Sequence, residues 1–457
     1  MEIEGFFTND RTQVIHHTFP VFQKKSIHIE ILEGVFEHIL IIVKDPSHKI
    51  RAVLTFKSRI KSNVITAGER ESSNSTVPGI LENGIWSLDI VRTYQVSGDY
   101  KIAINFDMGT YSSESFNPMA QKMEIIKDRR IGWFKGDLHM HSYYTDGRVS
   151  FEEIDKACKS QNLDFIAVTD HSIFTTKYLE CSYLVIPGTE ITWDDSGHYN
   201  CWGLNQFIDY GYYLNKGKDF DSSLDLMFSD LSSKDLILSQ NHPFPFGWSL
   251  NHNFSLSNID TIEVINAPHL FPGEVDNKKA ICLFDYLWQN HILLYAVGGS
   301  DAHKKNYFDE YPIGIPTTKV YCEGLSIRNL LNGIKRGNSF IECNMDFEIN
   351  YKTGKKFKDT VLPGDLISGE VLIQARAKQK VTWRIIKNGK IFLSKESKFI
   401  SEKIVVKKDE YYRLQADVED EIVLFVNPIH NIEHSNKNVM FQDILKQFYK
   451  VVDSWHT

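Results

Sequence analysis

Nine side chains of the types that bind divalent metal ions occur between positions 139 and 303. Six of them are histidines, from the 17 in a chain of 457 residues, and three are carboxylates. Imidazole and carboxylate ligands without thiolate suit Zn²⁺, Mn²⁺ or Fe²⁺. Their order and spacing predict a centre of more than one divalent ion that carries out metal-assisted hydrolysis. The candidates are His139, His141, Asp146, His171, Glu190, His198, His242, Asp301 and His303.

The motif GDLHMHS places His139 and His141 two residues apart at the end of an apolar run. Because side chains alternate along a strand, both imidazoles are expected to face the same ion. The motif SDAH arranges Asp301 and His303 in the same way. Most of the other candidates also lie at or after the end of an apolar run, as expected where the C-terminal ends of barrel strands build an active site. His198 is the exception, because it opens its run.

The elements expected to position these residues lie between 132 and 344, where short apolar runs alternate with helical patterns. That alternation is typical of an α/β fold with a parallel sheet that helices cover on its outer side. One helix is expected from about Phe151 to Ser160, where Ser150 and Glu153 form a capping box. Another is expected from about Glu274 to Asn290. A closed or distorted (βα) barrel of about seven units fits this pattern.

Strand-like patterns dominate on both sides of this central domain, residues 132–344. Residues 1–125 carry short β-rich runs separated by turns, which predicts a β-sandwich-like N-terminal domain. Residues 346–457 favour a β-rich C-terminal domain, interpreted as a second sandwich that ends in a helix near Phe441 to Val452. Within it, the dipeptide Asn388-Gly389 predicts a two-residue hairpin.

The acidic balance of the chain limits its expected partners. Its 59 acidic and 51 basic residues give a formal net charge of −8, without a basic patch. Binding to nucleic acid or to an anionic membrane through non-specific charge is therefore not expected. The N-terminus lacks a signal-peptide pattern, and no apolar stretch reaches the ~20 residues of a membrane span. Six cysteines without a CxxC pair predict buried free thiols in a cytoplasmic protein. No pattern indicates an oligomeric state.

Six motifs, HMH, TDG, TDH, GTE, NHP and SDAH, together resemble the PHP (polymerase and histidinol phosphatase) superfamily of metallohydrolases. GTEIT followed by GHYN, with β-rich flanks, is similar to the CehA/McbA-like branch of that superfamily. The resemblance covers residues 132–344 and implies a distorted (βα)7 TIM-like barrel with two or three metal ions. The implied ligand sets are His139, His141, Glu190 and Asp301 for one ion, Glu190, His198 and His242 for a second, and Asp146, His171 and His303 for a third.

Charge counting favours a small anionic ester as the substrate. Three divalent ions would bring six positive charges, and the three carboxylates among the ligands would return only three negative ones. Such a field stabilises the charge that develops on a phosphoester during displacement. We therefore interpret the chain as a phosphoesterase that uses a metal-bridging hydroxide. Asp301 and His303, next to the ions, are the candidates to protonate the leaving group.

Two other classes of function stay open. A carboxyl-ester, carbamate or amide hydrolase would use the same hydroxide, and the loops after the strands are poor in the Arg and Lys that phosphatases often supply. Lys304 and Lys305 are the main exceptions. A glycan- or protein-binding module with structural metals is disfavoured, because structural sites usually hold one closed tetrahedral ion. A proofreading exonuclease domain is disfavoured by the acidic balance.

Other residues near the motifs have two interpretations each. Asp170 could orient the imidazole of His171 or cap a strand end, and Asn241 could orient a ligand or bind substrate. His252, His269 and Tyr143 are secondary candidates for the proton donor. The aromatic residues that follow the ligands either wall a pocket or pack in the core: Tyr143, Tyr144, Trp193, Tyr199, Trp202, Phe244, Phe246 and Trp248.

Overall fold

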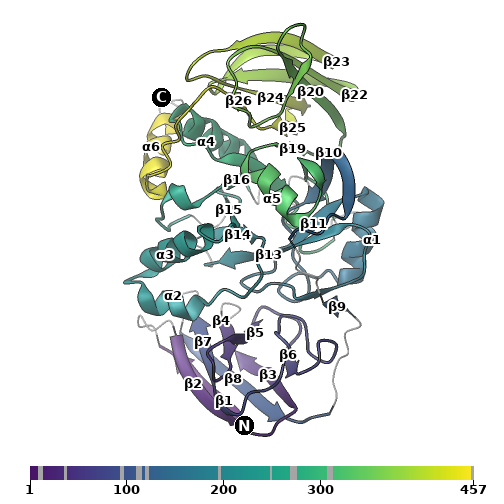
Figure 1. The fold of residues 1–457 in the computed structure, drawn as a ribbon. Helices are drawn as coiled ribbons and strands as arrows, with labels where there is room; N and C mark the ends of the chain where they lie inside the picture. The colour runs from purple at the N-terminus through teal and green to yellow at the C-terminus, as the bar shows by residue number, and fades with distance from the viewer. Residues whose placement is uncertain are drawn as a thin grey trace.

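A computed structural model of the chain gives the fold. The structure describes residues 1–8, 14–34, 39–92, 97–109, 116–118, 123–193, 197–246, 250–267, 275–305 and 312–453. His269 and Trp248 lie outside these ranges. Figure 1 shows a strand-rich mixed α/β protein with the N-terminal strands at one end, the C-terminal strands at the other, and the helices α1 to α5 mostly between them.

The first eight strands form two antiparallel four-stranded sheets around a shared apolar core. Alternate residues of β3, including Ile27, Ile29 and Ile31, are buried in that core. One sheet has the order β1 (Glu2–Phe7), β8 (Gly98–Phe106), β3 (Ser26–Gly34) and β6 (Ser62–Thr66). The other has the order β2 (Val14–Val21), β7 (Gly84–Arg92), β4 (Ile39–Lys44) and β5 (Ile50–Thr55).

Strand β4 is apolar on both faces because both faces are covered. Ile39, Ile41 and Val43 pack in the core between the two N-terminal sheets. Leu40 and Ile42 point the other way and belong to the large core of the central part of the chain. Burial on both sides removes the usual alternation of apolar and polar residues. The N-terminal sheet is therefore packed directly against the part that carries the candidate ligands.

The central strands follow one another in the order β10-β11-β13-β14-β15-β16-β17. All of them run in the same direction except β14, which is antiparallel to both its neighbours. A parallel bridge between Met140 and Ala302 joins the chain segments just after β10 and β17, so the two edges of this sheet meet there. The strands are β10 (Asp128–Asp137), β11 (Phe165–Val168), β13 (Leu184–Thr192), β14 (His198–Trp202), β15 (Ile237–Gln240), β16 (Thr261–Asn266) and β17 (Tyr295–Gly299).

This sheet differs from the all-parallel sheet expected from the sequence. β14 is reversed, and β11 and β13 are each followed by another strand instead of a helix. The connection between β13 and β14 spans only residues 193–197, and a short connection suits an antiparallel neighbour, whereas a parallel neighbour needs a long crossover. The regular alternation of a (βα)7 barrel is therefore not seen in the described residues. These residues contain six α-helices: α1 (Phe151–Gln161), α2 (Tyr210–Lys216), α3 (Phe220–Ser232), α4 (Asn277–Gln289), α5 (Ile327–Lys335) and α6 (Phe441–Asp453).

Local signals in the sequence placed several helix ends correctly. The capping box is confirmed: the Ser150 side chain accepts from the backbone N–H of Glu153, whose side chain accepts from the N–H of Ser150. Helix α4 begins after Asp276, whose side chain accepts from the N–H of Lys279. It is shorter at its start than expected because this cap lies inside the predicted range.

The C-terminal strands are joined to the central sheet by hydrogen bonds and enclose an apolar core of their own. β10 pairs with β18 (Thr317–Leu325), and the order then runs β19 (Ser339–Glu342), β25 (Glu421–Val426), β24 (Tyr411–Val418), β22 (Gly369–Lys387), β20 (Phe347–Thr353) and β21 (Asp359–Val361). β23 (Lys390–Val406) pairs with β22, and β26 (Ile429–His430) with β24. The predicted hairpin is confirmed: Asn388 and Gly389 link β22 to β23 with φ of 45° and 73°.

A two-stranded pair joins β9 (Asn117–Pro118) to β12 (Lys177–Tyr178). No helix of the described residues has the length and apolar character needed to cross a membrane. All six cysteines are free thiols, and Cys158, Cys201, Cys322 and Cys343 are buried, as expected for apolar packing residues.

Candidate metal centre

The nine candidate ligands lie together at one edge of the central sheet. Six of its seven strands point their C-terminal ends at this edge, which is why motifs far apart in sequence meet there. The strand positions are His139 and His141 after β10, His171 after β11, Glu190 within β13, His198 at the start of β14, His242 after β15, and Asp301 and His303 after β17. Asp146 lies in the loop after His141.

The reversed strand β14 explains the position of His198. His198 opens its apolar run, which would put it at the opposite edge of an all-parallel sheet. Because β14 is antiparallel to β13, with Thr192 opposite His198, its beginning lies beside the ends of its neighbours. The imidazole Nδ1 of His198 is 3.3 Å from Oε1 of Glu190. The reversed direction of β14 therefore brings His198 to the same edge as the other candidates, although His198 opens its apolar run.

Glu190 is the middle of the cluster and is fully buried. Its two carboxylate oxygens face different histidines, so this one side chain can bridge two cations. Asn241 Nδ2 donates to Oε1 at 2.8 Å and fixes the orientation of the carboxylate. The separations between its oxygens and the nearest ring nitrogens are 2.9 Å for His171, 3.2 Å for His139, 3.3 Å for His198 and His242, and 3.5 Å for His141.

Asp301 is the second carboxylate beside the His139–His141 pair. Its Oδ1 is 3.2 Å from Nε2 of His139 and 3.1 Å from Nε2 of His141, and these two nitrogens are 3.3 Å apart. The Nε2 atoms of His139 and His141 therefore point to the same place, as the alternation of side chains along a strand predicts. Asp301 has a φ of 49°, a conformation that costs a non-glycine residue about 1–3 kcal/mol and is frequent at functional sites.

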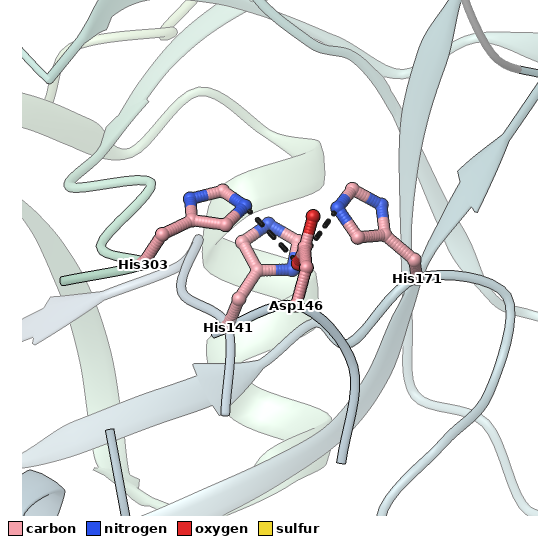
Figure 2. A group of neighbouring side chains, drawn as sticks. All are labelled: His141, Asp146, His171 and His303. Atoms are coloured by element: carbon pink, nitrogen blue, oxygen red, sulfur yellow. Dashed lines mark ion pairs between the residues drawn. The ribbon is translucent and has the colours of Figure 1, made fainter. Parts of the chain in front are cut away.

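A second focus of the cluster surrounds Asp146. Figure 2 shows its carboxylate between the imidazoles of His303 and His171, with His141 beside it. Oδ1 of Asp146 is 3.4 Å from Nε2 of each of the two outer histidines. The rings of His141 and His303 are stacked with centroids 4.1 Å apart. Asp146 and His303 are each 32 % exposed, more than the other candidate ligands, so solvent reaches the cluster on this side.

The donor set fits divalent cations. The buried oxygens Asp146 Oδ1, Glu190 Oε2 and Asp301 Oδ1 have no hydrogen-bond partner among the described residues, which is costly unless something else satisfies them. Ring nitrogens and carboxylate oxygens are also the ligands that Zn²⁺ and Mn²⁺ prefer. Four groups have ligand atoms that all lie within 4.8 Å of one another: His141, Asp146, His171 and His303; His139, His141 and Glu190; His139, His242 and Asp301; and His171, Glu190 and His198.

These groups divide the ligands differently from the resemblance, most clearly at His198 and His242. The resemblance pairs His198 with His242 at one ion. In the structure His198 groups with His171 and Glu190, and His242 groups with His139 and Asp301. Both histidines nevertheless lie 3.3 Å from the same oxygen of Glu190, and their rings are 5.1 Å apart. The assignment of each histidine to an ion therefore stays a prediction.

Glu263 is a member of the site that sequence reasoning missed. Its Oε1 lies 3.0 Å from Nδ1 of His139, and its Oε2 accepts from the backbone N–H of His242 at 3.0 Å and from Asn266 Nδ2 at 3.0 Å. The same Asn266 amide donates to Asp301 at 3.2 Å. A carboxylate on the far nitrogen of a ligand imidazole fixes its tautomer and raises its basicity. The sequence signal that could have revealed Glu263 is that it is the one charged residue in the strand TIEVIN, whose six residues are all buried.

Asp170 supports the site in a different way from the one suggested by its position beside His171. Its carboxylate accepts from the backbone N–H of Ser142 at 2.8 Å, from the Ser142 hydroxyl at 2.6 Å and from the Thr145 hydroxyl at 2.7 Å. These bonds hold the loop that carries Asp146. The Nδ1 of His171 lies 2.6 Å from the Thr192 hydroxyl instead.

The carboxylates and histidines strongly shift one another's protonation. Burial lowers the pKa of His139, but Asp301, Glu263 and Glu190 outweigh it and raise the pKa well above its ordinary value. Burial and Lys57 lower the pKa of His171, but Asp146 and Glu190 raise it to about 9. Burial raises the pKa of Glu190, yet the surrounding histidines hold it well below its usual range. The carboxylate of Glu190 is therefore charged, and it lies among histidines whose positive form it favours.

His141 behaves in the opposite way. Burial and the neighbouring His303 and His171 lower the pKa of its imidazole to about 3. A neutral imidazole is the form that binds a metal. His141 is thus a ready ligand at neutral pH, at the position shared by the two foci of the cluster.

The N-terminal sandwich reaches the loop that holds Asp146. Arg59 donates from its backbone N–H to the carbonyl of Tyr143 at 3.2 Å and from Nε to the carbonyl of Gly147 at 3.0 Å. Lys57 extends its Nζ to 3.7 Å from Oδ2 of Asp146. Neither residue has a motif that marks it in the sequence. They were missed because they come from a different part of the chain.

The aromatic residues after the ligands mostly pack in the core. Tyr144, Trp193, Tyr199, Trp202 and Phe244 are buried, whereas Phe246 is exposed. The interpretation of a continuous aromatic wall around a pocket is therefore not supported by their burial. His252 lies 2.8 Å from Asp221 and packs on Trp193, which places it with this core.

No family model matches the chain. Among characterised proteins, a segment of 61 residues is 38 % identical to the DNA polymerase/3′-5′ exonuclease PolX of Bacillus subtilis (strain 168), covering 13 % of this chain and 10 % of that protein. The chain thus spans only about a tenth of the length of that polymerase.

Two solved structures overlap with more of the chain but at low TM-scores. One is a two-domain protein containing a predicted PHP-like metal-dependent phosphoesterase from Bacteroides vulgatus ATCC 8482, with 16 % identity, a TM-score of 0.37 and coverage of 71 % of this chain and 99 % of that chain. The other is an FMN-binding beta-glucuronidase from Facaelibacterium prausnitzii L2-6, with 8 % identity, a TM-score of 0.20 and coverage of 92 % and 91 %. Neither overlap is strong enough to establish a shared fold.

Proposed function

We propose that the chain is a metal-dependent hydrolase of the PHP type that cleaves phosphoesters. The observation that carries this proposal is the cluster of nine imidazole and carboxylate side chains, with Glu190 between its two halves. A single structural ion needs about four ligands in a closed tetrahedron, and this cluster has too many donors for that role. It also opens to solvent at Asp146 and His303.

Divalent ions held by these residues would lower the pKa of water and offset the negative charge on phosphoryl oxygens. The residues of the chain itself have separate tasks. Glu190 and the histidines around it hold and space the cations, and Glu263 and Asn241 keep the ligand groups oriented. We propose that His141, Asp146 and His171 alone would hold an ion at the open side, and that His303 there donates the proton to the leaving group from Nε2. Its Nε2 faces Asp146, and its Nδ1 lies 2.8 Å from the carbonyl oxygen of Asp301.

The match to an exonuclease supports phosphoester chemistry over a carboxyl ester, since exonucleases cleave phosphodiesters. A carboxyl-ester, carbamate or amide hydrolase with the same centre is the second candidate. The scarcity of basic residues after the strands favoured it, but the fold adds Lys57 to this edge from the N-terminal sandwich. The exonuclease match and the position of Lys57 are the reasons why we place the phosphoester first.

The test compares hydrolysis of 4-nitrophenyl phosphate, bis(4-nitrophenyl) phosphate and 4-nitrophenyl acetate by protein loaded with Mn²⁺ or Zn²⁺. Phosphoester turnover should be lost in His139→Ala and kept in His434→Ala, which removes an exposed histidine of the C-terminal region. The mono- or diester preference then narrows the substrate. Hydrolysis of the acetate alone would replace the proposal by the second candidate.

A further inference from the structure

Lys57 lies in the turn that follows β5, and its side chain is directed at the metal cluster. Its Nζ is 3.7 Å from Oδ2 of Asp146, and the side chain is only 12 % exposed. At 3.7 Å the two groups form an ion pair without a hydrogen bond. The N–H donors of the ammonium group are therefore not used up by Asp146.

The backbone around Lys57 is held in place on both sides. Its own N–H donates to the Thr55 hydroxyl at 3.2 Å, and Lys61 Nζ donates to the carbonyl of Phe56 at 2.6 Å. Two residues further on, Arg59 is bonded to the loop that carries Asp146. The turn and the loop thus form one connected unit. Because this backbone is fixed and the Lys57 side chain is only 12 % exposed, binding of a ligand costs it little conformational freedom.

We propose that Lys57 binds an anionic oxygen of the substrate, which makes the N-terminal sandwich part of the active site. This inference rests on the proposed phosphoester chemistry. Asp146 turns Oδ1 towards His171 and His303 and Oδ2 towards Lys57, so the lysine stands beside the ligand group that solvent can reach. A cation at Asp146 would offset the negative charge of that carboxylate. Lys57 would then add a positive charge beside the solvent-exposed side of the cluster.

The phosphoryl group is the anion that this position suits. Its oxygens can contact cations on one side and an ammonium group on the other, and lysine is a compact point charge that binds phosphate without strict geometry. A neutral carboxyl ester would gain little from it. The competing explanation is that Lys57 serves only to hold Asp146 in position. The two explanations differ in whether loss of the lysine affects the anion or the metal.

The experiment measures two quantities on the metal-loaded protein: the affinity for inorganic phosphate by calorimetry, and the metal content by elemental analysis. The variants are Lys57→Gln, Lys57→Arg and a matched control, Lys44→Gln. Lys44 belongs to the same sandwich, is 13 % exposed and pairs with Asp209 of the central part at 2.7 Å. We expect Lys57→Gln to weaken phosphate binding about 10-fold or more with unchanged metal content. Lys57→Arg and Lys44→Gln should stay near the wild type.

Three outcomes would overturn the inference: no phosphate binding by the wild type, equal binding by Lys57→Gln, or parallel loss of phosphate and metal. The last would leave Lys57 as a residue that only positions Asp146. The proposed function fails separately. If phosphate binds through Lys57 but no phosphoester is hydrolysed, the anion site stands and the reaction is wrong. If phosphoesters are hydrolysed equally well by Lys57→Gln, the reaction stands and the role of Lys57 is wrong.

Discussion

The carboxylate of Glu263, in the middle of strand β16, lies 3.0 Å from Nδ1 of His139. Both side chains are buried, and the opposite nitrogen of the same ring faces Glu190 and Asp301. This contact fixes which nitrogen of His139 is offered to a cation. Strand β16 contributes no ligand of its own, yet it determines the geometry at the first histidine of the HMH motif.

We therefore expect Glu263→Gln to weaken metal binding about 10- to 100-fold, because an amide cannot hold the imidazole tautomer as a carboxylate does. Competition with a chromogenic chelator measures the affinity. Glu348→Gln, at an exposed position of β20, is the control and should bind metal like the wild type. Equal affinities for the two variants would show that His139 is oriented without Glu263.

Asp146 has a role distinct from that of Glu190, because its neighbours are His171 and His303 at the open side of the cluster. We expect Asp146→Ala to reduce the bound metal by one equivalent while the buried group of His139, Glu190 and Asp301 keeps its ions. Elemental analysis after dialysis gives the stoichiometry. Asp99→Ala, an exposed change in the N-terminal sandwich, serves as the control. Loss of all metal in Asp146→Ala would mean that the ions at Asp146 and at Glu190 do not bind independently.

The candidate ligands could be recognised in the sequence, and their meeting at one edge expected, because each motif is local: a strand end followed by a short run of His, Asp or Glu. The direction of β14 could not, since antiparallel pairing with β13 and β15 depends on contacts with strands elsewhere in the chain. That direction is what brings His198 to the cluster. The same limit applies to the C-terminal region, whose hydrogen-bonded connection to the central sheet was not predicted. Its strands join the central sheet through β18 and β19, and such pairing leaves no mark in the local pattern.

The supporting residues were harder to find than the ligands. Glu263 sits in the middle of a buried strand and belongs to none of the six sequence motifs. Lys57 comes from a sandwich that precedes the ligands by about 80 residues, and it reaches Asp146 only because β4 and β5 pack on the central core. Conversely, most of the aromatic residues near the ligands were ambiguous in sequence and are core residues in the fold.

The pH dependence of metal binding follows from His171. Burial and Lys57 lower the pKa of this imidazole, but Asp146 and Glu190 raise it to about 9, above the ordinary 6.5. In the metal-free protein the protonated ring therefore stabilises the fold fully below pH 6.5, and this stabilisation is lost as the pH rises through about 9. A metal ion needs the neutral ring, so its affinity increases over the same interval.

The increase in melting temperature caused by saturating Mn²⁺ should consequently be larger at pH 9 than at pH 6.5. Paired thermal melts with and without the ion measure it. His171→Ala should reduce the dependence to the part that His139 contributes, whereas His434→Ala should leave it unchanged. An increase that is the same at both pH values would contradict the assignment of His171 as a ligand that binds a proton in the metal-free state.

Arg413 and Asp285 form a buried pair that ties β24 to helix α4. The guanidinium donates from Nε to Oδ1 at 2.9 Å and from Nη2 to Oδ2 at 2.6 Å, and Tyr411 donates to the backbone carbonyl of Asp285 at 3.1 Å. We expect Arg413→Ala to reduce the free energy of unfolding by about 3–5 kcal/mol, because it leaves Asp285 as an unpaired buried charge. Urea denaturation followed by tryptophan fluorescence measures this loss.

The double variant Asp285→Leu with Arg413→Met separates the cost of the orphaned charge from the value of the pair. Replacing a buried ion pair by apolar side chains of similar size is often neutral or stabilising. The double variant should therefore regain most of the stability that Arg413→Ala loses, and Arg129→Ala, at an exposed position, should cost little. If the double variant is as unstable as Arg413→Ala, the bidentate pair itself is what holds the C-terminal strands to α4.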